Sequence, residues 1–214
     1  METEPITKTL MLGIMKSYYS VALALALFAA AVAAQNADVK IPDEVKPFVE
    51  AGTIADALEA GDLNGDGRRD FILVLSKIVK EDDRYEEGAG ARSVILLIRD
   101  AGGKLQAVGR NEEVAMCKNC GGVFGDPFEG VSVQRTKFTV MNYGGSSDRW
   151  AYSYSFAYSR RDQNWQLVKV EESHFKTFDP ERSRKTKIYA PPKDFGLITF
   201  ADFDPANFKQ KGKK

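Results

Sequence analysis

Side chains of two kinds alternate strictly along one stretch in the second half of the chain. Aromatic residues occupy every second position, at Trp150, Tyr152, Tyr154, Phe156 and Tyr158, with alanine or serine between them. Successive side chains of a strand point to opposite faces, so this pattern predicts a β-strand with one aromatic and one small face. Two interpretations of the aromatic face stay open. It packs as core, or its first three residues form a stacking platform for sugar rings or other flat ligands.

Several other apolar runs predict strands. They are rich in β-branched and aromatic residues and end at clusters of glycine, asparagine or charged residues. The turns between them are short, which favours antiparallel pairing, because a parallel pair needs a long crossover. The expected strands are 71–79, 93–98, 131–133, 138–140 and 165–170.

Helix is sparse in this sequence. Three short segments have helix-forming patterns, and they are 42–51, 53–60 and a last turn at 204–208. Together the patterns predict a mainly β fold, of the β-rich α+β kind. We expect antiparallel sheets with a few short helices in a single domain.

The first part of the chain has the pattern of an export signal. Lys16 precedes an apolar segment over 21–33, and small residues follow it up to Gln35. The segment is shorter than the roughly 18 to 20 apolar residues of a membrane span. We expect a periplasmic or secreted protein whose mature chain has no transmembrane anchor. The expected divisions are a signal peptide at 1–34 with a true start near Met15, a globular domain at 35–208 and a basic tail at 209–214.

Acidic and basic residues balance, with 30 of each and a formal net charge of zero. A dedicated nucleic-acid binder would show a net basic face, so we expect no nucleic-acid partner. The basic stretch 182–187 and the basic tail fit a solvated surface and a frayed end. Contact of these segments with an anionic envelope polymer is the alternative.

The most informative motif lies at 62–70, where oxygen-bearing side chains occupy alternate positions. Gly67 allows a sharp turn, so that the next carbonyl can face the same point as the side chains. An all-oxygen donor set of this size suits calcium better than magnesium, which keeps several waters. A metal-free turn closed by Asn and Asp side chains is the alternative. The expected ligands are the side chains of Asp62, Asn64, Asp66 and Asp70 and the carbonyl oxygen of Arg68.

This loop resembles the calcium loops of FG-GAP and VCBS-type repeats, in which D-x-[DN]-x-D-G-x-x-D lies between two strands. The four side chains match that pattern, with Arg68 as the carbonyl donor. The EF-hand loop is similar too, but Leu73 stands where its bidentate glutamate would be, and a predicted strand follows. The resemblance implies a calcium site. The motif occurs once and the chain has no internal repeat, so we expect no full propeller.

Two cysteines, Cys117 and Cys120, make up the whole cysteine content. In an oxidising compartment a short-range disulfide is the default for such a pair. A thioredoxin-like redox pair is one alternative, although two glycines and no helical pattern follow the second cysteine. Zinc is the other alternative, but it needs a second ligand pair and His174 is the one histidine.

The sequence lacks the common catalytic motifs. It has no G-x-S-x-G and no H-E-x-x-H, and a serine triad would have to use His174. Features over 117–170, such as the Gly-Asp-Pro-Phe run at 125–128, resemble exported bacterial proteins to which we can attach no activity. We therefore expect an exported calcium-binding protein of the bacterial cell envelope, a non-catalytic binding module with an envelope or extracellular partner, for which a glycan is one candidate. The alternative is an envelope hydrolase that cleaves polysaccharide or peptidoglycan through carboxylates.

Overall fold

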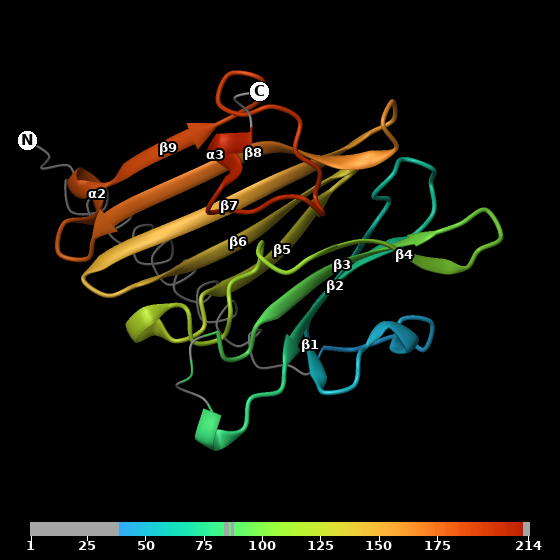
Figure 1. Ribbon diagram of the computed structural model, residues 1–214, viewed down its shortest axis with the longest axis horizontal. Coiled ribbons are helices and arrows are strands. Elements are labelled where there is room, and N and C mark those ends of the chain that lie inside the picture. Colours follow the sequence, from blue (N-terminus) through green and yellow to red (C-terminus); the bar gives the residue numbers. More distant parts are fainter. Residues whose placement is uncertain (1–38, 84–85, 87, 212–214) are drawn as a thin grey trace, which may run out of the picture. The chain divides into compact units, whose positions relative to one another are not determined.

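Two antiparallel sheets make up most of the structure (Figure 1), a computed structural model that describes residues 39–83, 86 and 88–211. The first sheet has the order β1-β2-β3-β4 and consists of β1 (Thr53–Gly61), β2 (Asp70–Lys77), β3 (Arg92–Arg99) and β4 (Leu105–Asn111). The second has the order β5-β6-β7-β8-β9 and consists of β5 (Phe128–Gln134), β6 (Lys137–Gly145), β7 (Asp148–Ser159), β8 (Asn164–Lys176) and β9 (Lys185–Tyr189). The predicted β-rich, antiparallel fold class is confirmed. The described residues form neither a closed barrel nor a propeller.

The described helices are single turns. They are η2 (Lys46–Phe48), η3 (Glu81–Asp83), η4 (Gly122–Phe124), α2 (Pro180–Ser183) and α3 (Phe208–Lys211). No helix in the described part of the chain is long and apolar enough to cross a membrane. The expected signal peptide at 1–34 and the last residues of the basic tail lie outside the described residues.

The helix predicted over 53–60 is wrong, because this segment is strand β1. Its alanines and leucine favour a helix, but β1 pairs with β2 from Thr53 opposite Lys77 to Gly61 opposite Asp70. Strand pairing with a buried neighbour outweighs a weak local preference for helix. The helix predicted over 42–51 shrinks to the 3-10 turn η2, which contains Pro47.

Three smaller differences concern the later part of the chain. Residues 204–207 form a turn, in which the Asn207 amide donates to the Asp204 carbonyl, and helix α3 begins only at Phe208. Strands β4 and β9 were not among the predicted strands. Both lie at sheet edges, where exposed polar side chains hide the alternation that marks a half-buried strand.

Strands β2 and β3 are buried on both faces, which explains their nearly continuous apolar sequences. On β2, Ile72 and Val74 belong to the main core between the two sheets. Phe71, Leu73 and Leu75 belong to a second cluster with Val45 and other residues of the N-terminal segment. Uninterrupted apolar runs are typical of strands covered on both sides.

The C-terminal segment completes the main core. Its buried aromatic residues are Phe195, Phe200, Phe203 and Phe208. The backbone amide of Phe200 donates to the carbonyl of Trp165 on β8, and the side-chain amide of Asn111 on β4 donates to the carbonyls of Phe200 and Phe203. Figure 1 shows this red segment running in front of β7 and β8. The C-terminal segment thereby connects β4, an edge strand of the first sheet, to β8 of the second sheet.

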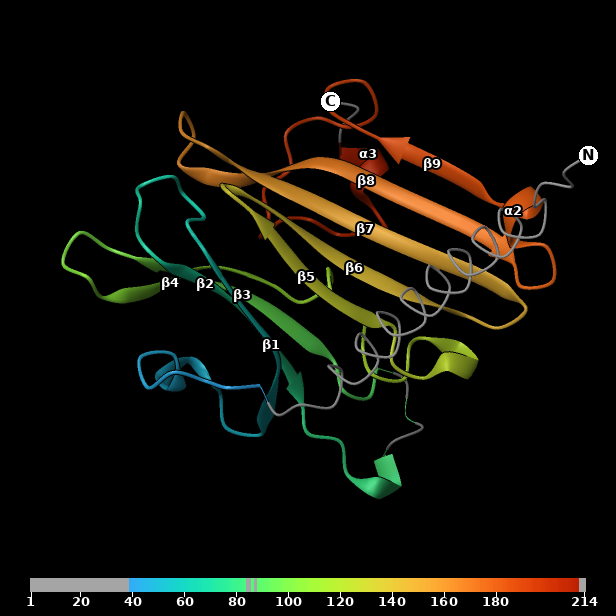
Figure 2. The same ribbon diagram turned by 180° about the vertical axis from the view of Figure 1, so that it is seen from behind.

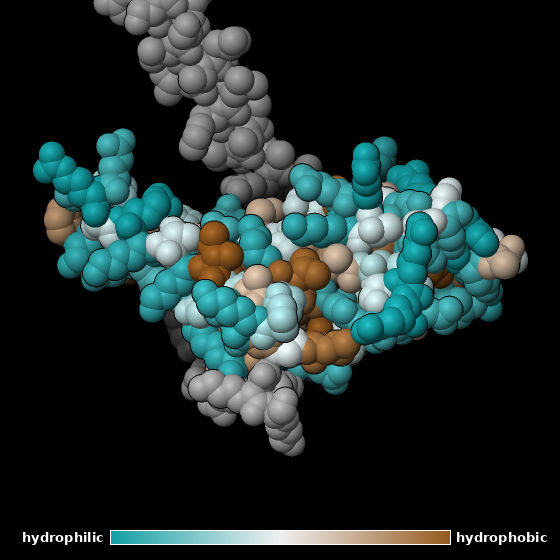
Figure 3. All heavy atoms as spheres, turned by 90° about the horizontal axis from the view of Figure 1, so that it is seen from above, coloured by the Kyte–Doolittle hydropathy of each residue, from teal (hydrophilic) through white to brown (hydrophobic). Residues whose placement is uncertain are grey.

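Exposed apolar side chains are scattered over the surface. Figure 3 shows one face on which hydrophilic residues predominate and hydrophobic ones form small separate groups. The large exposed ones include Val123, Phe178, Ile188 and Leu197, which come from different elements. Single exposed apolar residues of this kind are ordinary for a folded protein.

The turn between β7 and β8 gives a pH-dependent prediction. The Ser159 hydroxyl, Arg161 and the Gln166 amide all donate to Asp162, and they lower the pKa of its carboxyl from 3.8 to about 2. A lowered pKa in the folded state stabilises the fold above the unfolded pKa, and this contribution is lost as the pH falls from about 4 towards 2. We expect Asp162→Asn to flatten the pH dependence of stability over that interval. Urea unfolding of both proteins from pH 5 to pH 2 measures it, and parallel curves would contradict the prediction.

Candidate metal centre

The candidate calcium loop connects β1 to β2, two paired strands of the first sheet. Gly61 and Asp70 are the last paired residues of this hairpin. Gly65 and Gly67 have φ values of 80° and 84°, a region that suits glycine and almost no other residue. The predicted position of the loop, directly before a strand and not before a helix, is confirmed.

Backbone amides of the loop are bound by its own polar side chains. The carboxylate of Asp62 accepts hydrogen bonds from the amides of Gly65, Asp66 and Gly67 at 2.7, 3.1 and 2.9 Å. The Asn64 side chain accepts from the Asp66 amide at 3.0 Å and donates to the Asp66 carboxylate at 2.9 Å. These bonds hold the side chains of Asp62, Asn64 and Asp66 against the backbone of one compact turn.

Asp70 differs from the other acidic residues of the loop because it is completely buried. Its two carboxylate oxygens accept from the amides of Leu63 at 2.9 Å and Arg99 at 2.8 Å. Burial raises the pKa of Asp70, the two amide bonds oppose this, and the charges of Asp66 and Asp62 raise the pKa further. Burial is the largest of these effects, so the pKa of Asp70 is raised overall.

The donor set of the loop fits a calcium ion in chemistry, since it contains only carboxylate, amide and carbonyl oxygens. In residues 39–83, 86 and 88–211, however, no three carboxylate, histidine or cysteine side chains already converge as the ligands of a metal would. Many of the loop oxygens face backbone amides, and Arg68 lies 3.5 Å from Asp66. The hydrogen bonds agree with the metal-free turn expected as an alternative. Calcium binding at Asp62, Asn64, Asp66, Arg68 and Asp70 stays a prediction.

One apolar residue anchors the loop to the rest of the protein. The side chain of Leu63 is fully buried, and its carbonyl accepts from the indole nitrogen of Trp165 on β8 at 3.0 Å. Its amide is the group bound by Asp70. Leu63 thus connects the loop to Asp70 of the first sheet and to Trp165 of the second. This role could not be predicted from a single apolar residue in a polar sequence.

Cys117 and Cys120 are joined to each other, with an S–S distance of 1.99 Å and 5.2 Å between their Cα atoms. The expected pairing is confirmed. A disulfide leaves no thiolates for the zinc alternative. The bridge lies in the connection between β4 and β5, and this connection continues into η4.

The aromatic face of β7 divides into a buried and a half-exposed part. Tyr154 and Phe156 belong to the main core, so the expectation of a ligand contact is corrected for Tyr154, which a stacking ligand cannot reach. Trp150 and Tyr152 are half-buried, and their rings stack at 4.9 Å. His174 lies edge-on to Tyr152 at 5.7 Å. Trp150 and His174 also line an open hollow of about 340 Å³ at this end of the sheet.

Comparisons with protein-family models, with curated protein sequences and with solved structures found no match to this chain.

Proposed function

We propose that this chain is an exported calcium-binding protein of the bacterial cell envelope, which binds a partner and does not catalyse a reaction. The observation that carries the proposal is the loop at 62–70. Asp62, Asn64 and Asp66 lie within one tight turn, and Asp70 begins the strand that follows it. The pKa of Asp70 is raised, first by burial and to a smaller extent by the charges of Asp66 and Asp62, and a bound cation would favour its charged form.

Calcium at this loop would have a structural role. The loop is fixed at its C-terminal end by Asp70 and near its N-terminal end by Leu63, whose carbonyl accepts a hydrogen bond from Trp165 of the other sheet. An ion held by protein oxygens would make the β1–β2 hairpin more rigid and would have little room for a substrate. The apolar segment at 21–33 and the disulfide support an extracytoplasmic location. Trp150 and Tyr152 are the half-exposed rings that a sugar could reach.

The proposal is tested by titrating calcium into the purified protein in a calorimeter and by measuring thermal unfolding. We expect a single binding event, and at a free calcium concentration of about one hundred times Kd we expect about 2.7 kcal/mol of added stability. Asp66→Ala should abolish both effects, because this variant removes one carboxylate from the centre of the donor set.

Asp100→Ala is the matched control. Asp100 also closes a tight turn, by accepting from the Lys104 amide at 2.9 Å, but it lies outside the candidate loop. This variant should bind calcium as the parent does. Absence of a calcium event in the parent, or unchanged binding by Asp66→Ala, would reject the proposal.

A further inference from the structure

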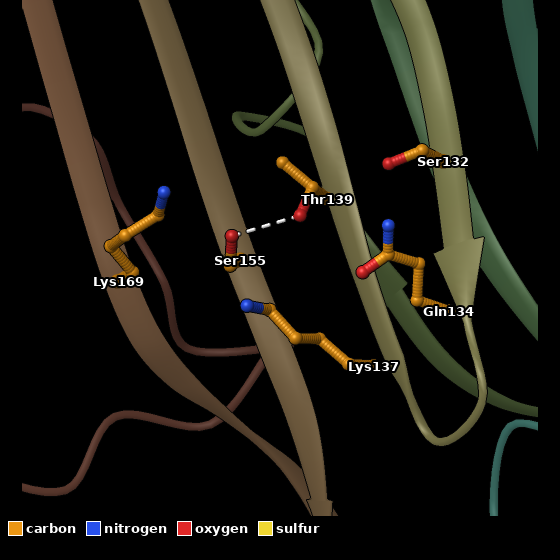
Figure 4. Close-up of a pocket in the computed structure, with 6 residues that line it drawn as sticks. All are labelled: Ser132, Gln134, Lys137, Thr139, Ser155 and Lys169. Atoms are coloured by element: carbon orange, nitrogen blue, oxygen red, sulfur yellow. Dashed lines mark hydrogen bonds between the residues drawn. The ribbon is translucent and has the colours of Figure 1, made fainter.

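The outer face of the second sheet carries a polar hollow that the proposed function does not use. Figure 2 shows this face, on the side of β5 to β8 away from the C-terminal segment. The hollow has a volume of about 200 Å³. Its lining consists of Ser132, Gln134, Lys137, Thr139, Ser155 and Lys169 (Figure 4).

Strand register brings these side chains together from four strands. Thr139 on β6 lies opposite Ser155 on β7, and Ser155 lies opposite Lys169 on β8. Ser132 on β5 lies opposite Thr139 on its other side. Adjacent positions in register share a face of the sheet, so this row of polar side chains crosses four strands.

Two lysine side chains flank a pair of hydroxyls at the centre of the hollow. The hydroxyls of Thr139 and Ser155 are 2.8 Å apart and hydrogen-bonded to each other. Figure 4 shows the amino groups of Lys137 and Lys169 on either side of Ser155. Ser155 is only 1% exposed, so it lies at the floor of the hollow, below the longer side chains that line it.

The charge of the hollow is positive. Its lining contains two lysines and no carboxylate. Lys169 forms an ion pair with Glu171 in the next row at 2.9 Å, and this pairing compensates part of its charge. Within the described residues Lys137 forms no ion pair. An anion in the hollow would therefore pair with Lys137, and it would also be attracted by the part of the Lys169 charge that Glu171 leaves uncompensated.

We propose that this hollow binds a phosphate or sulfate group. Such a group has several charged oxygens, so it can contact both amino groups and a hydroxyl or the Gln134 amide at the same time. Lysine binds phosphate as a point charge and does not need the planar geometry of arginine. The hollow is open to solvent on one side, so the bound group can be a free ion or an ester carried by a larger molecule.

The test is a titration of the ¹⁵N-labelled protein in calcium-free buffer at constant ionic strength, followed by NMR. The ligands are inorganic phosphate, inorganic sulfate and glycerol phosphate, which represents a phosphate ester. We expect saturable shifts of the Thr139 and Ser155 amides. Lys137→Gln and Lys169→Gln should each weaken binding about 3- to 10-fold, and Lys137→Arg should keep it. Tighter binding of glycerol phosphate than of the inorganic ions would identify an ester as the ligand.

Lys187→Gln is the control, because Lys187 lies on β9 of the same sheet and outside the hollow. This variant should bind all three ligands as the parent does. Shifts that do not saturate, or equal weakening by Lys187→Gln and Lys137→Gln, would overturn the proposal and leave only general attraction to a basic surface. The outcome of this experiment does not affect the proposed calcium site, since the 62–70 loop contributes no residue to the hollow.

Discussion

Replacing Asp70 by alanine should lower the free energy of unfolding by about 2 to 5 kcal/mol, even in the absence of calcium. The substitution removes the acceptor for two amides, those of Leu63 and Arg99, from a position with no solvent exposure. Each buried amide that loses its partner costs about 1 to 3 kcal/mol. Urea unfolding with excess chelator measures this loss.

Asp66→Ala is the matched comparison, since it removes a carboxylate from the same loop at a partly exposed position. In chelator it should cost less than about 1 kcal/mol, because solvent can replace the lost hydrogen bonds. The two residues would then have separable roles, because Asp70 would stabilise the fold without calcium and Asp66 would be required for calcium binding. Equal losses for the two variants, or a loss below about 1 kcal/mol for Asp70→Ala, would contradict the burial argument.

Most of the strands could be predicted because their signal is local. The alternation over 150–158 marks β7, and the two long apolar runs mark β2 and β3, which are covered on both faces. Strand β1 was missed because what makes it a strand is its pairing with β2, while its own residues favour a helix. Such an error is expected wherever a distant neighbour decides the conformation.

In the candidate site, too, local features could be predicted from the sequence and contacts between distant residues could not. The members of the calcium loop are neighbours in sequence, so their spacing alone could indicate them. The contacts that hold the loop in place could not be predicted, because Leu63 and Trp165 are 102 residues apart in the chain. The polar hollow of the second sheet depends on the register of four strands, and no short motif contains that information.

The second large effect is expected at Arg92, whose side chain is only 2% exposed. Its guanidinium donates to Asp56 at 2.6 Å, to the carbonyl of Met116 at 2.5 Å and to Asp126 at 2.5 Å. It also lies 4.9 Å from the centre of the Phe128 ring. These partners come from β1, from β5 and from the connection that contains the disulfide, so one side chain joins three separate parts of the fold.

Arg92→Met should therefore lower the free energy of unfolding by about 3 to 5 kcal/mol. Methionine fills part of the space, but it leaves the carboxylate of Asp56, which is only 11% exposed, with Lys118 at 3.2 Å as its remaining ion-pair partner. Removing one partner of a buried ion pair costs much more than the pair contributes, because the other charge stays buried. Arg92→Lys should recover only part of the loss, since one amino group cannot reach in three directions as a guanidinium does.

Arg110→Met provides the control for this measurement. Arg110 also binds two carboxylates, those of Glu50 and Glu112, but its side chain is 39% exposed. Ion pairs in contact with water contribute about 0 to 1 kcal/mol, so this variant should unfold almost as the parent does. Urea unfolding of the three variants beside the parent compares buried with exposed arginine directly. Similar losses in the free energy of unfolding for Arg92→Met and Arg110→Met would show that burial does not increase the contribution of the Arg92 network to stability. A loss several times larger at Arg92 is the expected result, because its partner Asp56 is only 11% exposed, whereas Glu50 and Glu112 beside Arg110 are in contact with water.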